Sequence, residues 1–291
     1  MEHEVESMSV KIITDSTAYL PEDYLTQYDI DVVSLNVVMD GQSRRELELS
    51  NDTFYEEMAR AKEIPKSAQP SMDELTAAFE RAAEKGQDIL AIFLSSKLSG
   101  TVTSAGPLTA KMVMEKYPEC HIEVFDSLNT GMPMGFLAIE AAKAAQAGQS
   151  LTEVLQVAQE ARDKIHFVFC PDTLDYLRMG GRIGGASALL GNLLQIKPIL
   201  TVKEGAVIVL DKVRSQKKAI ASIIDIMLED VKNSAGLGDI IVHHINCPED
   251  GRKLADSLQT TLDHPVRIQS IGPIVGIHVG PGSIGIAYIL K

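Results

Sequence analysis

The sequence predicts an α/β fold in two parts: an N-terminal domain with a parallel sheet and helices on both faces, and a C-terminal α+β domain with a mixed or antiparallel sheet. In the first part, short β-branched or apolar runs alternate with helical segments, which favours parallel strands joined by right-handed crossovers. After about residue 166, strand-like runs follow one another more closely. We therefore expect domains over residues 1–165 and 166–291.

Local patterns predict the elements of the first domain. Strands are expected at residues 10–13, 32–38, 89–94 and 122–125. The pairs Ser71 with Glu74 and Ser150 with Glu153 have the spacing of capping boxes, in which the two side chains satisfy free N–H groups at a helix start. An Ala-rich segment at residues 136–147 predicts a third helix.

In the second domain the expected strands are short and closely spaced. They lie at residues 167–170, 199–202, 206–210, 240–245, 266–271, 276–279 and 284–290. The Lys-Glu-Gly segment at residues 203–205 is typical of a hairpin turn between two of these strands. A hairpin inside the sheet makes that sheet at least partly antiparallel.

The composition limits the classes of function. Apolar residues make up 45% of the 291 residues, which indicates a folded globular chain. The formal net charge of −13 argues against binding nucleic acid or an anionic membrane, because both need a basic surface. No apolar run approaches the roughly 20 residues that span a bilayer, and residues 1–9 are too polar for a signal peptide. We therefore expect a cytoplasmic protein without a transmembrane segment.

Motifs for metal binding, nucleotide binding and nucleophilic catalysis are missing from the sequence. Cys120, Cys170 and Cys247 are widely separated, so no metal site is expected. There is no P-loop, no G-x-S-x-G and no H-E-x-x-H. Residues 280–285 match G-x-G-x-x-G, but too few residues follow to supply the helix and acidic residue of a dinucleotide site.

The turn at residues 95–101 is the most informative segment. The apolar strand at residues 89–94 leads directly into this Ser- and Thr-rich turn, and a helical pattern follows. A helix start attracts anions through its free N–H groups and its dipole. The turn has one lysine and no Walker-type ending, so it favours a carboxylate or similar small anionic group over a triphosphate. A Ser/Thr-rich helix cap without a ligand explains it equally well.

Three further polar loops lie at the ends of predicted elements of the first domain. They are residues 14–17, 67–71 and 126–127. Loops at the carboxyl ends of parallel strands converge on one crevice, where ligands bind. Ordinary turn chemistry explains each loop alone, so the prediction rests on their joint location.

Basic residues of the second domain add candidates. Arg182 lies among paired glycines, where its guanidinium can face a carboxylate or phosphate; a helix end with a solvated arginine is the alternative. Arg214 belongs to a basic cluster that fits either an acidic or phosphorylated partner or a solvated helix start, with Lys212, Lys217 and Lys218. His278, expected at a strand end, either touches a ligand's head group or is a core histidine.

Taken together, these motifs resemble the DegV family. The resemblance rests on segments in the family's order, at residues 13–17, 67–71, 94–105, 126–127, 176–183, 196–200, 212–219 and 272–285. It implies a two-domain fold that holds a long-chain fatty acid, for example palmitate, stearate or oleate, in a buried tunnel between the domains, with no other cofactor. It also implies a non-catalytic subunit of a bacterial fatty acid kinase, whose ATP-using partner resembles dihydroxyacetone kinase and phosphorylates the acyl carboxylate.

The resemblance also assigns roles to residues. It implies that Ser67 and Ser99 hold the carboxylate and that His278 lies close to the same head group. Secondary contacts with the head group are expected from Ser16, Ser96, Gly100 and Arg182. Arg182 and Arg214 match family arginines linked to the phosphorylated head group or to docking of the kinase. The chain departs from the family's pattern with Ser-Ala at residues 67–68 and Asn-Thr-Gly at residues 129–131.

Two other functions fit the sequence. One is a lipid-binding regulatory or scaffold protein whose fatty acid is only structural. The other is a serine acyl hydrolase or transferase with Ser99 as nucleophile and His278 as base. For a fatty-acid carrier, burying about a dozen methylenes supplies about 10 kcal/mol, whereas head-group hydrogen bonds supply about 1–3 kcal/mol. The tail is therefore expected to set the affinity and the polar groups to set the orientation.

Overall fold

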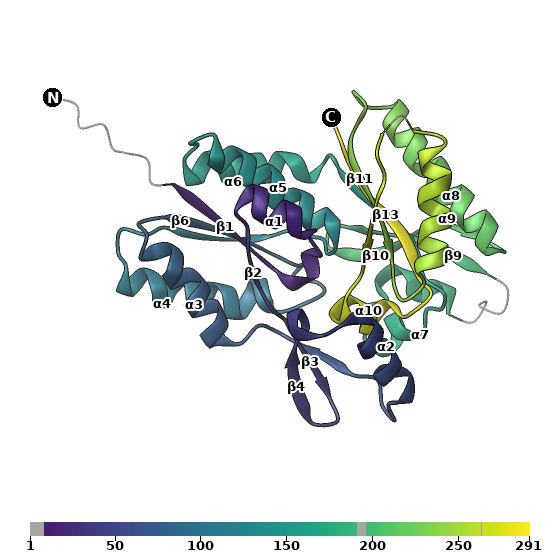
Figure 1. The fold of residues 1–291 in the computed structure, drawn as a ribbon, viewed down its shortest axis with the longest axis horizontal. Coiled ribbons are helices and arrows are strands. Elements are labelled where there is room, and N and C mark those ends of the chain that lie inside the picture. The colour runs from purple at the N-terminus through teal and green to yellow at the C-terminus, as the bar shows by residue number, and fades with distance from the viewer. Residues whose placement is uncertain (1–8, 191–195, 263) are drawn as a thin grey trace.

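The structure is a computed structural model that describes residues 9–190, 196–262 and 264–291 (Figure 1). Residues 1–8 of the polar N-terminal segment lie outside these described residues. The described strands form a four-stranded, a six-stranded and a three-stranded sheet. The α/β class, the parallel sheet and the mixed sheet in a second domain are all as predicted.

The four-stranded sheet of the first domain is parallel and has helices on both faces. Its order is β2-β1-β6-β7, formed by β1 (Val10–Asp15), β2 (Asp31–Val33), β6 (Asp88–Phe93) and β7 (Ile122–Asp126). One face packs against α3 (Met72–Ala83) and α4 (Gly106–Lys116), and the other against α5 (Met132–Gln146) and α6 (Leu151–Arg162). Both faces are therefore buried, which explains the continuous apolar runs of its strands.

The predicted helix starts are present. The Ser71 hydroxyl accepts the Glu74 N–H at 3.2 Å at the start of α3. At the start of α6, Ser150 and Glu153 form a complete capping box. The Glu74 side chain instead accepts the Ser34 N–H at 2.8 Å, so the first pair makes only half of a box. The third predicted helix, α5, begins four residues earlier than its Ala-rich segment.

The six-stranded sheet has the order β10-β9-β8-β13-β11-β12. Its strands are β8 (Ile165–Cys170), β9 (Lys197–Lys203), β10 (Ala206–Val213), β11 (Leu237–His244), β12 (Arg267–Ser270) and β13 (Ile284–Leu290). The pair β11–β12 is parallel and the other pairs are antiparallel. Helices α8 (Gln216–Lys232) and α9 (Pro248–Gln259) pack on one face. Glu204 and Gly205 have positive φ at the predicted β9–β10 hairpin turn.

The prediction of one strand over residues 32–38 is wrong. The segment divides into β2 and β3 (Asn36–Met39), and β3 pairs with β4 (Gln42–Arg45) and β5 (Lys66–Ala68) in the separate three-stranded sheet. The break occurs because side chains take the backbone N–H groups between the two strands. Glu74 accepts the Ser34 N–H, and Ser16 Oγ accepts the Leu35 N–H at 3.0 Å.

The prediction of a strand at residues 276–279 is also wrong. These residues belong to helix α10 (Pro273–Val279). Proline at the first helical position lacks an N–H to satisfy, which favours a helix start there. Gly280 follows with φ of 91° and ends the helix. The β-branched residues that suggest a strand face two sides of α10, with Ile274 and Ile277 buried.

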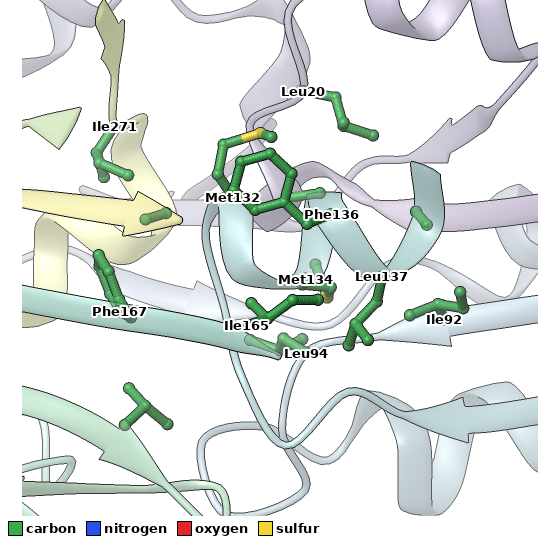
Figure 2. Packing of buried hydrophobic residues seen from close by; sticks show 14 of the residues in the cluster. Leu20, Ile92, Leu94, Met132, Met134, Phe136, Leu137, Ile165, Phe167 and Ile271 are labelled. Atoms are coloured by element: carbon green, nitrogen blue, oxygen red, sulfur yellow. The ribbon is translucent and has the colours of Figure 1, made fainter. Parts of the chain in front are cut away.

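Helix α5 lies between the two larger sheets. Eleven of its 15 residues are buried, so it is apolar around most of its circumference. Figure 2 shows Met132, Phe136 and Leu137 of this helix between Ile92 on one side and Phe167 on the other. His243 of β11 fixes its start: Nε2 accepts the Met132 N–H at 3.1 Å, while Nδ1 bonds the Gln269 carbonyl at 3.0 Å.

The remaining helices of the described residues are short, and they pack against α5 or α10. They are α1 (Glu22–Tyr28), α2 (Asn51–Arg60) and α7 (Asp175–Met179), with 3-10 turns at Ser16–Ala18, Glu46–Glu48 and Gly184–Leu189. A π-helical turn at Thr101–Ala105 leads into α4. Strand β6, the polar turn and helix α4 therefore follow one another as predicted. The π-helical turn lies between the polar turn and α4.

We predict that His243→Gln makes stability less sensitive to acid. Burial lowers the pKa of His243 from 6.5 to about 4, because the charged ring loses its hydration. As pH falls from 6.5 to 4, the unfolded chain takes up a proton that the folded chain does not, so the wild type loses free energy of unfolding. His243 contributes on the order of 3 kcal/mol to this loss of free energy of unfolding.

Urea unfolding of wild type and variant across this pH range measures the effect as a difference in slope. His121→Gln, at an exposed histidine, is the matched control. Equal slopes for the wild type and His243→Gln would contradict the prediction.

Candidate functional site

A cavity of about 400 Å³ lies between strands of the six-stranded sheet, β5 of the three-stranded sheet and the segments that follow β2 and β6. This volume is within the range of about 300–1,000 Å³ that is usual for small-molecule sites. Most of the lining is aliphatic or aromatic, including Leu94, Phe167, Phe169, Val202, Ile271 and Ile274. Such walls favour an apolar ligand, because burying its surface removes it from water.

Four polar lining residues come from parts of the chain that are far apart. Ser67 lies on β5, Ser99 in the turn after β6, Arg182 after α7 and His278 on α10. Two contacts bring these segments together. His278 Nε2 lies 2.8 Å from Ser67 Oγ, and Arg182 Nε donates to the Leu98 carbonyl at 3.1 Å. The charge of Arg182 also acts on the His278 ring, which links the two pairs into one polar cluster on the cavity wall.

His278 is neutral and tightly enclosed. Burial first, and the positive charge of Arg182 second, lower its pKa to about 4. Its Nδ1 is buried and has no hydrogen-bond partner among the described residues. Gly180 lets the chain after α7 lie close to the His278 ring, since a Cβ at Gly180 would clash with Nδ1. A neutral imidazole beside Ser67 can donate one hydrogen bond or accept one, depending on its tautomer.

Arg182 is the one formally charged residue among the described lining residues. Its guanidinium donates to two carbonyls, Leu98 O at 3.1 Å and Gly180 O at 2.6 Å. Carbonyl partners hold the side chain in place without neutralising its charge. Because no carboxylate is among the described residues that line the cavity, this charge favours an anionic group there.

The turn that carries Ser99 is anchored from both sides. Ser95 Oγ donates to the Gly205 carbonyl at 2.9 Å, which joins the turn to the β9–β10 hairpin. The Ser96 N–H donates to the Asp126 carboxylate at 3.2 Å. Ser99 Oγ lies 3.1 Å from Thr101 Oγ1, and Gly100 lines the cavity beside it. The hydroxyl of Ser99 is therefore held at the wall by a rigid turn.

The structure brings Ser67, Ser99, Gly100, Arg182 and His278 to one cavity, but three other candidate residues are not on its lining. Ser16 is buried elsewhere: its hydroxyl donates to Glu46 Oε2 and accepts the Leu35 N–H. Ser96 lies in the turn and is bonded through its N–H to Asp126. Arg214 is exposed between β10 and α8.

Five polar lining residues were absent from the candidates: Gln69, Thr130, His243, His244 and Ser283. Gln69 shares the polar loop with Ser67, and the alternation of an extended segment could have found it, because residues two apart point the same way. Thr130 is buried, and its Oγ1 has no hydrogen-bond partner among the described residues. The one sequence signal at Thr130 is the departure from the family's pattern at residues 129–131.

Two further searches concern residues 9–190, 196–262 and 264–291. Within these ranges, no helix is both long and apolar enough to cross a membrane. The same residues contain no group of three or more His, Cys, Asp or Glu side chains that could hold a metal ion.

Comparison with known proteins places the chain in a family. The profile of the DegV family, described as uncharacterised proteins, matches residues 9–291. A DegV domain-containing protein of Clostridium perfringens is 44% identical over 97% of this chain and 99% of its own length.

Solved structures of similar proteins have the same fold. A DegV family protein from Thermus thermophilus, described by its fatty acid binding, superposes with a TM-score of 0.89 at 27% identity, covering 98% of this chain and all of that one. DegV of Bacillus subtilis, described as a fatty acid binding protein, gives a TM-score of 0.86 at 31% identity with the same coverage. The profile match over residues 9–291, the 44% identity to the Clostridium perfringens protein and the fold shared with DegV of Bacillus subtilis lead to one conclusion: this chain belongs to the DegV family.

Proposed function

We propose that this chain binds a long-chain fatty acid such as palmitate, stearate or oleate, with its carboxylate at the polar cluster and its tail along the apolar lining. One observation carries the proposal: among the described residues that line this mostly apolar cavity, Arg182 is the one formally charged residue, and it shares the lining with the hydroxyl-bearing Ser67 and Ser99. Family structures described as fatty acid binding support it. In this proposal the domains, residues 1–165 and 166–291, enclose the ligand between them.

The head group is proposed to accept hydrogen bonds from Ser67 and Ser99. If His278 carries its proton on Nε2, it donates to Ser67 Oγ, and the Ser67 hydroxyl is then free to donate to the ligand. Arg182 supplies positive charge nearby while its own carbonyl contacts hold it in place. The carboxylate thereby gains hydrogen bonds and a countercharge in place of water.

We further propose that the chain does not act on the fatty acid itself but presents it to a separate ATP-dependent kinase resembling dihydroxyacetone kinase. Use of ATP implies that the complex works in the cytoplasm. The exposed basic cluster around Arg214 supports a docking role, because it gives this acidic chain a positive patch that can attract an acidic surface on a partner. Arg182 is proposed to meet the phosphorylated head group at the cavity.

An acyl hydrolase or transferase is the second candidate, and its geometry differs from the pairing expected from the sequence. His278 contacts the Ser67 hydroxyl at 2.8 Å, so Ser67 rather than Ser99 has the base beside it. Among the described residues no carboxylate orients His278, whose Nδ1 has no partner. A serine nucleophile usually depends on such an orienting group. An acyl adduct on Ser67 after incubation with an activated ester would support this function over carriage.

Native mass spectrometry of the purified protein and analysis of its lipid extract test the proposed ligand. We expect an added mass in the fatty-acid range and binding of added palmitate or oleate. Ser67→Ala and Ser99→Ala should each weaken palmitate binding by roughly 10–100-fold, because each removes a hydrogen bond to a charged group. Ser96→Ala is the matched control, since Ser96 is not on the lining. A ligand-free protein that also fails to bind either acid would refute the proposal.

Thr130→Val tests the cost of the unpartnered hydroxyl. Thr130 Oγ1 is buried and has no hydrogen-bond partner among the described residues, and valine has nearly the same shape without that polar group. We expect the variant to gain about 1 kcal/mol in free energy of unfolding, because folding no longer desolvates an unpaired hydroxyl. Urea unfolding of wild type and variant measures the difference. A variant that is less stable than the wild type would contradict the prediction.

Arg214→Ala tests docking of the kinase. With a fatty acid kinase of this family and ATP, acyl-phosphate formation should fall by an order of magnitude or more, because an interfacial charge pair is lost. Palmitate binding by the variant itself should be unchanged, since Arg214 is not on the lining. Arg81→Ala, at an exposed arginine of α3, controls for the loss of one positive charge. Unchanged kinetics in Arg214→Ala would favour the regulatory or scaffold function.

A further inference from the structure

The N–H groups in the first turn of α10 are all accounted for. Pro273 has none, and the Gly276 N–H donates to the Gly272 carbonyl at 3.0 Å. The Ile274 N–H donates to Glu46 Oε1 at 2.8 Å, and the Val275 N–H donates to Tyr19 Oη at 3.1 Å. Tyr19 Oη then donates to the same Glu46 oxygen at 2.9 Å. Directly or through Tyr19, one carboxylate therefore caps two of these N–H groups.

Glu46 is itself fixed by the first domain. It is only 4% exposed, its other oxygen accepts the Ser16 hydroxyl, and its N–H donates to the Leu35 carbonyl at 2.9 Å. Burial raises the pKa of Glu46 to about 7, which shows that the site is a costly place for a carboxylate. An apolar side chain would avoid that cost but would leave the N–H groups of α10 unpaired.

Helix α10 connects this carboxylate to the cavity. Ile274, Val275, His278 and Val279 of α10 line the cavity, and His278 makes the contact with Ser67. The helix has seven residues, too few to hold its shape without tertiary contacts. Tyr55 adds a second anchor, because its hydroxyl bonds the Ile271 and Gly272 carbonyls just before the helix. Displacement at the start of α10 would therefore move the imidazole relative to Ser67.

We propose that Glu46 is a positioning residue of the head-group site: through Tyr19 and the N-terminus of α10, it holds His278 against Ser67. The role in ligand binding rests on the proposed function, but the effect on His278 does not. Glu46 lies outside the cavity lining, so it acts through α10 and not by contact with a ligand.

Two substitutions at Glu46 separate positioning from simple burial. Glu46→Gln retains an oxygen that can accept from Ile274 and Tyr19, and its amide can donate to Ser16 Oγ. Glu46→Leu has a similar volume but no acceptor. We expect amide exchange at Ile274 and Val275 to accelerate at least about tenfold in Glu46→Leu and to stay near wild type in Glu46→Gln. The ring ¹⁵N signals of His278 should shift in the leucine variant only.

Binding measurements give a second readout. Palmitate binding should weaken about tenfold or more in Glu46→Leu, while binding of 1-hexadecanol, which has the tail without the carboxylate, should weaken less. Glu46→Gln should restore palmitate binding. If the wild type binds no palmitate, the proposed function fails, but exchange and His278 signals still decide the role of Glu46. Unchanged exchange and His278 signals in Glu46→Leu would overturn the inference.

Tyr19→Phe keeps the test decisive if Glu46→Leu does not fold. This variant removes the acceptor of the Val275 N–H and the hydrogen bond from Tyr19 to Glu46, but the Ile274 N–H keeps Glu46 as its acceptor. Exchange should therefore accelerate at Val275 while Ile274 stays protected. Tyr24→Phe is the matched control, since the Tyr24 hydroxyl donates to Asp239 at 2.7 Å and makes no contact with α10. Equal exchange at Val275 in wild type, Tyr19→Phe and Tyr24→Phe would refute the proposed relay.

Discussion

Packing around helix α5 determines how the two larger sheets are placed, and the cavity depends on that placement. The helix contacts β1 and β6 of the parallel sheet and β8 and β13 of the mixed sheet. It is apolar around most of its circumference, so both sheets bury surface against it. Gly135 lets α5 lie close to the turn at Ser16–Ala18, since a Cβ at this position would lie 3.2 Å from the Ala18 carbonyl oxygen. Thr130, just before the helix, lines the cavity, so the cavity begins where α5 no longer fills the space between the sheets.

The charges near the cavity are arranged around α10. The Glu46 carboxylate binds the N-terminal N–H groups of this helix outside the cavity lining, and Arg182 lies beside His278 on the lining. Burial keeps the His278 ring neutral, so Arg182 supplies the local positive charge. In the proposed function, one fixed cation and neutral hydroxyls would hold the anionic head group, which costs less desolvation than several buried charges would.

Features encoded within a few residues could be predicted from the sequence. The Ser150 capping box and the β9–β10 hairpin depend on neighbours three residues apart or fewer, and the alternation of strands and helices depends on local periodicity. The cap of α10 could not be predicted this way, because Glu46 and Ile274 are 228 positions apart. The β-branched residues of α10 favour a strand locally, and the tertiary cap overrides that preference.

In the candidate site too, local motifs pointed to residues, but contacts with residues far away in the sequence could not be predicted. The motifs that resemble the DegV family selected Ser67, Ser99, Arg182 and His278, and the structure places all four on the lining of one cavity. Their contact with a head group stays a prediction. Ser16 belongs to a matching motif, but its side chain points to Glu46 instead. Its neighbours in sequence give no sign of this, because the partner lies 30 positions away.

The contact between Ser67 and His278 joins residues 211 positions apart in the chain. The ribosome adds Ser67 long before it adds the residues of α10. The proposed head-group site is therefore incomplete until the last part of the chain has folded. Ligand that binds this site therefore stabilises only the fully folded protein and not its early intermediates. If the proposed ligand binds, only completely folded molecules would hold it, and it would protect them against proteolysis by lowering the population of opened forms.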